Sequence, residues 1–359
     1  MRLRRTHCLV CYWLGDEFVA HPYLHGSPVS LPSMTAEVLD AFGEWRTAED
    51  AARLLPAYTP ETVAQAVDVL AKNGLLLPEG SPDAAQDEHV ARQWESWSPE
   101  APFFHYGTRH DVFEQAGDQD RIDLVVDGRP PLFTSYPAAD RVLLPRPHSH
   151  LDIALVEALY ARRTHRRFAT ARVPLTSLAT LLAKTFGPVD YIDGGGFGAL
   201  YRRTSPQGGA RQEIDAYVGA RSVAGLAPGW FHYNAREHSL ELLAEGCTDL
   251  GKLCGGQEWV DGAAFVVVLV ARMERMMVKY RNPRAYRVCL LNAGHLGQTF
   301  ALVATALGVG PFQTGAFDDM ALTERLGLDG VTAVPLYVLG AGVPGGESDT
   351  VPAGLAAFR

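Results

Sequence analysis

The chain has 359 residues, of which 47% are hydrophobic and 20% are charged, the balance of an ordinary globular protein of about two domains. Its 32 Lys and Arg against 41 Asp and Glu give a net charge of −9, which argues against nucleic acid as the main partner. The longest strongly apolar run, residues 263–271, is about half of the ~20 residues that a membrane-spanning helix needs. We therefore predict no contact with a membrane.

The first residues lack the apolar core of a signal peptide, which predicts a cytoplasmic protein. Residues 7–13 and 17–20 alternate like strands around a turn at Gly15-Asp16. Cys8 and Cys11 have CxxC spacing, but no second pair completes a zinc site, so we interpret them as packing residues and expect no metal. Helices are predicted over 35–45, from Thr47, and from Thr59 to Asn73-Gly74, followed by a strand at 75–77.

This order of elements resembles a winged helix, a fold that often binds DNA. Residues 33–78 contain seven acidic residues against three basic ones, too few cations to neutralise phosphates. The segment is also similar in pattern to small peptide-recognition domains, related to the pyrroloquinoline quinone peptide chaperone, that hold leader peptides for modifying enzymes. Residues 1–90 are therefore predicted to bind a leader peptide or a partner, or to be a plain structural domain.

Residues 91–150 are predicted to be a connecting arm. Aromatic residues crowd between Trp94 and Tyr106, which is typical of an arm that packs on a neighbour. His148 and His150 form an HxH pair without a nearby carboxylate or Cys, so no metal site is predicted there either.

The third predicted domain, residues 151–359, begins with a helical run over 153–160 and then a strongly basic stretch. This stretch, the arginine cluster, consists of Arg162, Arg163, Thr164, His165, Arg166 and Arg167. Guanidinium groups placed so close together are stabilised by an anion, and their paired donors suit a phosphate. Taken alone, the cluster fits a solvated basic helix end equally well.

A second cluster combines glycines with hydroxyl and amide groups. It contains Ser205, Pro206, Gln207, Gly208 and Gly209. Adjacent glycines let the backbone approach a flat ligand closely, and the polar groups can bond the edge of a heteroaromatic ring. A strand is predicted over 214–218. The glycines do not match GxGxxG, so a Rossmann site is not expected.

Lys279 and Tyr280 come just before Asn282-Pro283, which predicts a break in secondary structure. Neighbouring residues point in different directions on a helix, so the pair would act together best at the end of an element. The alternative is a basic helix end. Residues 286–307 predict a long helix whose small residues, among them Gly294 and Gly297, would allow close helix contact at a dimer seam.

Five segments, taken in order, resemble the SagB/ThcOx-type dehydrogenases, a branch of the FMN-dependent nitroreductase superfamily. They are RRTHRRF, RRTSPQGGARQEIDAYV, GWFHYNAREHSLELL, VKYRNPRAYRVCLLNAGHLGQTFALVATALGVGPFQTGAFDD and LGLDG, within about residues 155–342. The resemblance implies an α+β, nitroreductase-like fold with a mainly antiparallel sheet flanked by helices. It also implies a homodimer with an FMN per subunit at the interface.

The same resemblance implies roles for single residues. Arg162, Arg163, Thr164 and Arg166 would hold the phosphate and ribityl groups of FMN, and Ser205 with the loop 206–210 would lie against the isoalloxazine. Gln207 stands where the family usually has Ser. Gln313, Thr314 and Gly315 would pass the N5 edge of the flavin. The late Lys-x-Arg of many nitroreductases is absent, since Arg359 is the single basic residue after Gly340, and Arg202, Arg203 or Arg211 are candidate replacements.

In the azoline dehydrogenases of this family an adjacent Lys-Tyr pair is the acid/base apparatus, which implies a catalytic role for Lys279 and Tyr280. Aromatising a thiazoline or oxazoline removes a hydride, which FMN can accept, and a proton, which the protein must accept. The implied function is azoline oxidation in ribosomal-peptide maturation, with a modified precursor peptide as substrate and a cyclodehydratase as partner. The alternatives are other two-electron chemistry, such as reduction of dehydroamino acids, quinones or nitro compounds, or a flavin- and peptide-binding scaffold without turnover.

Overall fold

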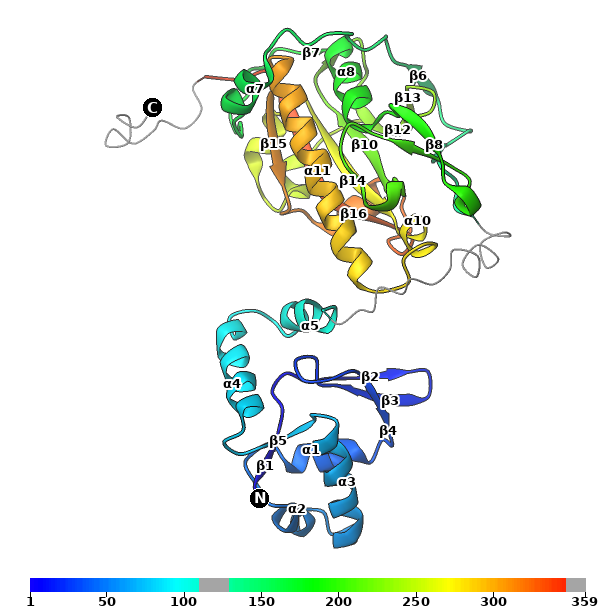
Figure 1. Cartoon of the computed structure of the whole chain (residues 1–359). Helices are drawn as coiled ribbons and strands as arrows, with labels where there is room; N and C mark the ends of the chain where they lie inside the picture. Colours follow the sequence, from blue (N-terminus) through cyan, green and yellow to red (C-terminus); the bar gives the residue numbers. More distant parts are fainter. Residues whose placement is uncertain (110–128, 347–359) are drawn as a thin grey trace. The chain divides into compact units, whose positions relative to one another are not determined.

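The computed structural model describes residues 1–109 and 129–346. The chain divides into two compact units, Met1–Phe113 and Glu114–Arg359, each of which has its own apolar core (Figure 1). Residues 110–128 of the predicted arm and the late basic residue Arg359 lie outside the described residues.

The N-terminal unit combines small antiparallel sheets with short helices. Its elements are β1 (Leu3–Arg5), β2 (Val10–Leu14), β3 (Glu17–His21), β4 (Val29–Leu31), α1 (Thr35–Ala41), α2 (Ala48–Leu54), α3 (Pro60–Lys72), β5 (Leu76–Pro78), α4 (Pro82–Trp94) and α5 (Glu100–Gly107). Strands β2, β3 and β4 form one sheet, and β1 pairs with β5. Gly15, with a φ of +59°, makes the tight turn between β2 and β3, a conformation that glycine adopts without steric cost.

Threonine caps begin α2 and α3 at the positions that the sequence predicts. The Thr47 hydroxyl accepts a hydrogen bond from the Asp50 N–H, and the Thr59 hydroxyl accepts one from the Thr62 N–H. Each cap pairs an amide that the first helical turn leaves without a partner. Helix α1 is shorter than predicted, because Phe42 leaves helical geometry and is fully buried in the core of this unit.

The aromatic residues of the predicted arm belong in part to this unit. The Phe103 ring of α5 packs edge-on against His21 and Tyr23, with centroid distances of 5.4 and 5.7 Å. Asp87 of α4 is fully buried and accepts the backbone N–H groups of His7 and Cys8. Helices α4 and α5 are therefore joined to the strands both by apolar burial and by a buried carboxylate.

The C-terminal unit is built around a long antiparallel sheet. Its elements are β6 (Arg141–Leu143), α7 (Leu155–Ala161), β7 (Val173–Pro174), α8 (Leu175–Phe186), β8 (Asp190–Asp193), η1 (Gly195–Phe197), β9 (Ala199–Arg202), η2 (Gly208–Ala210), β10 (Ile214–Ala220), β11 (Val223–Ala224), β12 (Gly229–Asn234), β13 (Ser239–Glu245), α9 (Leu250–Leu253), η3 (Glu258–Gly262), β14 (Phe265–Arg272), α10 (Met273–Met277), α11 (Arg284–Ala306), β15 (Gly310–Thr314), α12 (Asp319–Arg325) and β16 (Ala333–Gly342). The described part of the main sheet has the order β15-β16-β14-β10-β12-β13-β6, and every neighbouring pair in it is antiparallel. Strand β6 comes from the predicted arm.

Both faces of the main sheet are covered. Along β14, Val267 and Leu269 point into the core beneath α8 and α11, whereas Val266 and Val268 point into the core that includes residues of α9 and α12. This alternation follows the two-residue repeat of a strand. The predicted α+β architecture, an antiparallel sheet flanked by helices, is confirmed (Figure 1).

Helix α11 confirms the long helix predicted over 286–307. By length and composition α11 could cross a membrane, but half of its most apolar 18-residue stretch is buried within the protein. Gly297, Ala301 and Ala304 are buried, and Gly297 lies against Gln313 and Tyr337, so these small residues allow close packing on the sheet. Gly294 is exposed.

Two valines of α3 provide a direct test of the N-terminal core. Val63 is 1% exposed and Val69 is 48% exposed. We expect Val63→Ala to lower the free energy of unfolding of this unit by about 2 kcal/mol, because it removes two buried methyl groups and leaves a cavity. Val69→Ala, the matched control, should change it by less than about 0.5 kcal/mol. Equal effects of the two substitutions in urea titrations would contradict the packing described.

Candidate functional site

Lys279 and Tyr280 lie in the turn that follows α10. Their backbone N–H groups both donate to the Met276 carbonyl, at 3.1 and 2.9 Å, and α11 begins only at Arg284. The Lys279 Nζ is 5.4 Å from the centre of the Tyr280 ring. The predicted break is therefore confirmed, and the two side chains lie next to each other.

The glycine loop, residues 205–209, is fastened along one side of α11. The Ser205 hydroxyl pairs with that of Thr299 at 2.6 Å. The Pro206 carbonyl accepts from His295 Nδ1 at 3.1 Å, and the Gly208 N–H donates to Asn292 Oδ1 at 3.2 Å. His295 is exposed, and its hydrogen bond to this loop gives it a structural partner. The three helix residues are spaced three or four apart, so they line one face of α11.

Two glycines of this loop are required by the close approach of neighbouring side chains. A Cβ at Gly208 would overlap Val288 of α11, and a Cβ at Gly209 would overlap the Tyr280 hydroxyl. Gly209 also has a φ of +63°, in the left-handed region. The structure thus brings the catalytic candidate Tyr280 directly against the loop that the sequence predicts to hold a flat ligand.

The backbone just after this loop is strained. Ala210 and Gln212 have φ values of +52° and +51°, a region that side chains other than glycine rarely adopt. Such residues cluster at binding and catalytic sites, where the surrounding structure holds them in place. The strain lies on both sides of Arg211.

The Gln207 side chain has unsatisfied hydrogen-bonding capacity. Its amide nitrogen and oxygen are both buried, and neither has a hydrogen-bond partner among the described residues. A buried amide without partners is costly, so such a group indicates a ligand or a partner that completes its bonding.

Arg211 is a further member of this site. Its guanidinium lies 5.2 Å from the centre of the Phe197 ring, and Lys279 Nζ lies 5.5 Å from the same ring. Burial lowers the pKa of Arg211, and the nearby Tyr280 opposes that shift. One guanidinium nitrogen, Nη1, is buried without a hydrogen-bond partner among the described residues. The site therefore contains two cations, an aromatic ring and a phenol.

The three arginines considered as phosphate ligands differ in their surroundings. Arg203 uses its three nitrogens on Phe186 O, Ile214 O and the Tyr201 hydroxyl, all at 2.8–2.9 Å. Arg202 is exposed and pairs with Asp190 at 3.5 Å. Of these three, Arg211 alone combines burial with an unpartnered N–H in the part of the chain that the structure describes.

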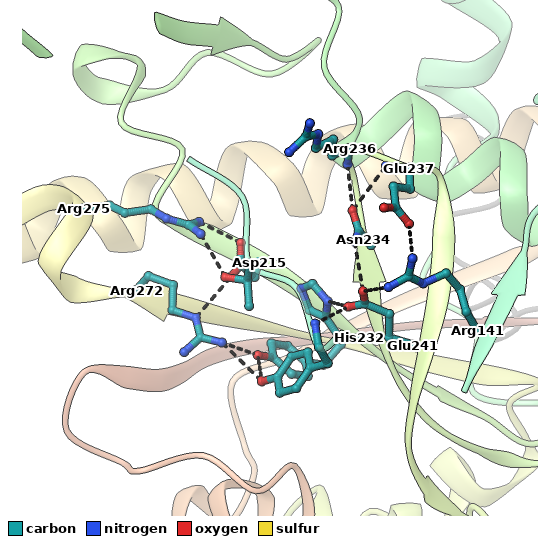
Figure 2. A network of polar contacts seen from close by, with 12 residues as sticks. Arg141, Asp215, His232, Asn234, Arg236, Glu237, Glu241, Arg272 and Arg275 are labelled. Atoms are coloured by element: carbon teal, nitrogen blue, oxygen red, sulfur yellow. Dashed lines mark hydrogen bonds and ion pairs between the residues drawn. The ribbon is translucent and has the colours of Figure 1, made fainter. Parts of the chain in front are cut away.

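A buried ion-pair network holds α10 on the sheet (Figure 2). Asp215 of β10 accepts from Arg275 at 2.8 Å and from Arg272 at 3.1 Å. Arg272 also donates to the Tyr217 hydroxyl, and Arg275 reaches the carbonyls of Pro131 and Gln212. Burial raises the pKa of Asp215, but Arg275 and the other partners lower it more, so the pKa lies well below the usual range. The carboxylate is therefore charged and fully paired.

The network continues across the sheet to Glu241 of β13, which is fully buried (Figure 2). His232 Nδ1 donates to one carboxylate oxygen at 2.8 Å, and Asn234 and Arg141 donate to the other at 2.9 and 3.2 Å. Burial raises the pKa of Glu241, and these hydrogen bonds outweigh it and lower the pKa to about 2. His232 is thus a structural residue, as its strand pattern indicates.

The arginine cluster lies toward the other end of α11. The His165 N–H donates to Pro311 O of β15 at 2.9 Å, and the Arg166 guanidinium lies 5.7 Å from the centre of the Trp259 ring. Figure 1 shows α7, which leads into this cluster, beside the C-terminal end of α11, and α10 toward the N-terminal end. The helix has 23 residues and is about 35 Å long. One chain therefore does not bring this cluster together with Lys279 and Tyr280.

The predicted N5-edge residues lie at the end of β15. Gln313 donates to Gly297 O at 2.6 Å and accepts from the Tyr337 hydroxyl at 3.0 Å, so both ends of its amide are engaged. The Thr314 hydroxyl accepts from Gln257 at 2.9 Å. Gly315 is exposed, with no atom within 4 Å of the position of a Cβ. Of the three, Gly315 leaves space for a ligand.

Residues 159–343, which include the long helix α11, the glycine loop and the strands of the main sheet from β10 to β16, match the sequence pattern of the Nitroreductase family. This chain belongs to the Nitroreductase family. It is 27% identical to the trifolitoxin-processing protein TfxB of Rhizobium leguminosarum bv. trifolii over 315 residues, 82% of this chain and 83% of TfxB.

The matches to two further proteins cover a smaller share of those proteins. The chain is 29% identical to the microcin B17-processing protein McbC of Escherichia coli over 146 residues, which is 38% of this chain and 53% of McbC. The crystal structure of a nitroreductase homologue from Anabaena variabilis ATCC 29413 matches with a TM-score of 0.54 and 24% identity. This match covers 68% of this chain and 47% of that one, and it supports the nitroreductase-like fold.

Sequence reasoning missed two parts of this site. Phe197 stands in a glycine-rich turn and carries no motif, so its position near both Arg211 and Lys279 was not predicted. The Asp215 network was missed as well, although a charged residue inside the apolar run 214–218 was a usable signal, because a buried carboxylate needs cationic partners.

The carboxylates of the network predict a loss of stability in acid. The folded pKa of Glu241 is about 2 against an ordinary 4.5, and that of Asp215 is also lowered. Their contribution is therefore complete above about pH 5 and is lost as the pH falls toward 2. We expect the free energy of unfolding to fall over this window. Glu241→Gln should reduce the dependence, and the exposed Glu245→Gln should not. Constant stability from pH 5 to pH 3 would contradict the network.

Proposed function

We propose that this chain is an FMN-dependent oxidoreductase of the SagB type, which oxidises thiazoline or oxazoline rings of a ribosomally made peptide to azoles. The observation that carries the proposal is the contact between the Lys279-Tyr280 turn and Gly209. The pair that we propose to accept the proton lies beside the loop that we propose to hold a flat redox cofactor. A peptide substrate is supported by the relationship to two proteins named for processing trifolitoxin and microcin B17.

The glycine loop fits FMN on the evidence of its own side chains. The unpartnered Gln207 amide can bond the heteroatom edge of an isoalloxazine, and Gly208 and Gly209 leave the backbone free of Cβ atoms. FMN, when bound, would accept a hydride. Its phosphate and ribityl groups would be held by Arg162, Arg163, Thr164 and Arg166, and its N5 edge would face Gly315.

A second copy of the chain would complete this site. The arginine cluster and the Lys279-Tyr280 turn lie toward opposite ends of α11, so two subunits are needed to bring such groups to one cofactor. Large apolar side chains are exposed on α7 and α11, as expected for a subunit interface. They are Leu155, Val156, Leu159, Tyr160, Leu290 and Leu291. We therefore infer a homodimer.

In this site the chain's own groups move the proton. Free Lys and Tyr are both protonated at neutral pH, so one of them must lose its proton before it can accept one from a ring carbon. Tyr280 works beside two cations, since Lys279 Nζ is 5.4 Å from the centre of its ring and the Arg211 guanidinium shares the Phe197 ring with Lys279. Lys279, next to Tyr280, can pass the proton on to solvent.

The N-terminal unit would present the substrate. Strand β2 is at the edge of its sheet, and Trp13 and Leu14 on it are exposed. An edge strand can add a peptide by backbone pairing, so we propose that residues 1–90 hold a leader peptide. The azoline would come from a cyclodehydratase partner in the cytoplasm.

The acid/base pair is tested by Lys279→Ala, with the exposed Lys252→Ala as the matched control. We expect Lys279→Ala to keep yellow flavin absorption but to lower the rate of flavin bleaching by a thiazoline peptide under anaerobic conditions by at least ~100-fold. Lys252→Ala should bleach at the wild-type rate. Bleaching that is unchanged in Lys279→Ala would remove the pair from the mechanism.

The same experiment on the wild-type protein separates the alternatives. Flavin that stays oxidised with the thiazoline peptide, but that after photochemical reduction is reoxidised anaerobically by a dehydroamino acid, a quinone or a nitro compound, would reassign the reaction to reduction of that compound. Flavin that responds to none of these compounds would indicate a scaffold.

The phosphate site is tested by Arg166→Ala, with the adjacent, exposed Arg167→Ala as the control. Loss of a charge-assisted contact to a phosphate costs about 1.5–3 kcal/mol, so we expect the Kd for FMN to rise by about 10- to 100-fold. Arg167→Ala should change it less than about threefold. Fluorescence titration of the apoprotein with FMN measures both, and full affinity in Arg166→Ala would place the phosphate elsewhere.

A further inference from the structure

A large cavity lies beside α10, and no residue of the glycine loop is among the described residues that line it. Its volume is about 1150 Å³, and it is lined by α10, by the first turn of α11, by α12 and by the segment that leads into β16. A cavity of this size accommodates several residues of a peptide or a drug-sized ligand. No step of the proposed reaction uses this cavity.

The cavity wall is rich in methionine. Met273 is buried at its base, whereas Met277 and Met320 are 57% and 84% exposed. Exposed methionine side chains are flexible and polarisable, so they adapt to side chains of different shapes. Such a surface suits a peptide whose sequence varies along its length better than it suits one rigid small molecule.

The charge of the cavity wall has one sign. Asp318, Asp319 and Glu324 line it, and no Lys or Arg is among its lining residues in the described part of the chain. Asp318 is partly engaged, because it accepts the Ala321 N–H at the start of α12. Glu324 also borders a neighbouring cavity that contains Lys252 and Arg325. Of these two cavities, Asp319 lines only the large one, and it is exposed.

The cavity is close to the reacting pair. Met277 stands two residues before Lys279, and Tyr286 of the cavity wall is in the first turn of the helix that follows Tyr280. Met273 and Val334 line the cavity and also pack in the same apolar cluster as Tyr280. The cavity wall and Tyr280 therefore belong to one packed region of the chain.

We propose that this cavity binds the part of the peptide substrate that flanks the oxidised ring, and that it selects a flank with an apolar residue next to a Lys or Arg. The proposal rests on the proposed function for the identity of the substrate. The apolar residue would lie among the methionines, and the cation would pair with Asp319. This pairing is solvent-exposed, so it contributes selectivity of a few-fold rather than most of the affinity.

The test uses the full chain loaded with FMN and three fluorescent thiazoline peptides that differ at one flanking residue, Lys, Gln or Glu. Affinity is measured by anisotropy, and kcat and KM by anaerobic flavin bleaching. In the wild type we expect the Kd and KM of the Glu peptide to exceed those of the Lys peptide by about threefold or more, with similar kcat. Raising the salt concentration should narrow the difference.

Two charge-reversal variants isolate the cavity. Asp319→Lys should invert the order of the Lys and Glu peptides, and the exposed Glu245→Lys, which changes the net charge equally but lies outside the cavity, should preserve it. The same order of peptides in Asp319→Lys and in the wild type would overturn the inference. So would a change in sedimentation of Asp319→Lys without a change in peptide affinity, since the cavity would then be a contact between copies.

The two proposals fail in different ways. Charge-dependent peptide binding without bleaching by any peptide would support this binding site and refute the proposed reaction. Bleaching at equal KM by all three peptides would support the reaction and refute this binding site.

Discussion

The buried carboxylate of Asp215 is the group on which the geometry of the site depends. It stands on the central strand β10 and pairs with Arg272, where β14 ends, and with Arg275 of α10. Arg275 also accepts the Arg211 Nε–H on its carbonyl at 2.8 Å. One ion-pair system therefore places the helix before Lys279 and the strained segment around Arg211 relative to the same strand.

Such a network is costly unless every member is paired, because each charge loses its hydration when it is buried. Here the pairing is dense, and the short distances around Asp215 and Glu241 show why both carboxylates stay ionised. An apolar contact in the same place would tolerate sliding of α10, whereas ion pairs and hydrogen bonds hold it in one register. A site that transfers a proton needs that register, since proton transfer requires hydrogen-bond distances.

Helix α11 carries the second half of the arrangement. One side of it is buried on the sheet, another binds the glycine loop through Asn292, His295 and Thr299, and its two ends lie toward the two groups of site residues. The loop packs closely on α11 because Gly208 has no Cβ, and it meets the Lys279-Tyr280 turn because Gly209 has none. Shared nitroreductase architecture does not specify a reaction, so the chemistry must be argued from these contacts.

Local features could be predicted from the sequence alone. Threonine caps, the break after Tyr280, the strand at 214–218 and the long helix near 286–307 follow from capping chemistry and apolar periodicity, which act over a few residues. The ordered motifs also indicated the family. The folded chain was needed to see that Tyr280 lies against Gly209 and that Asp215 anchors α10. It was also needed to see that, among the described residues, Arg211 rather than Arg203 has an N–H without a partner. These contacts join residues far apart in the chain, and their free energy depends on burial and pairing, which no local pattern encodes.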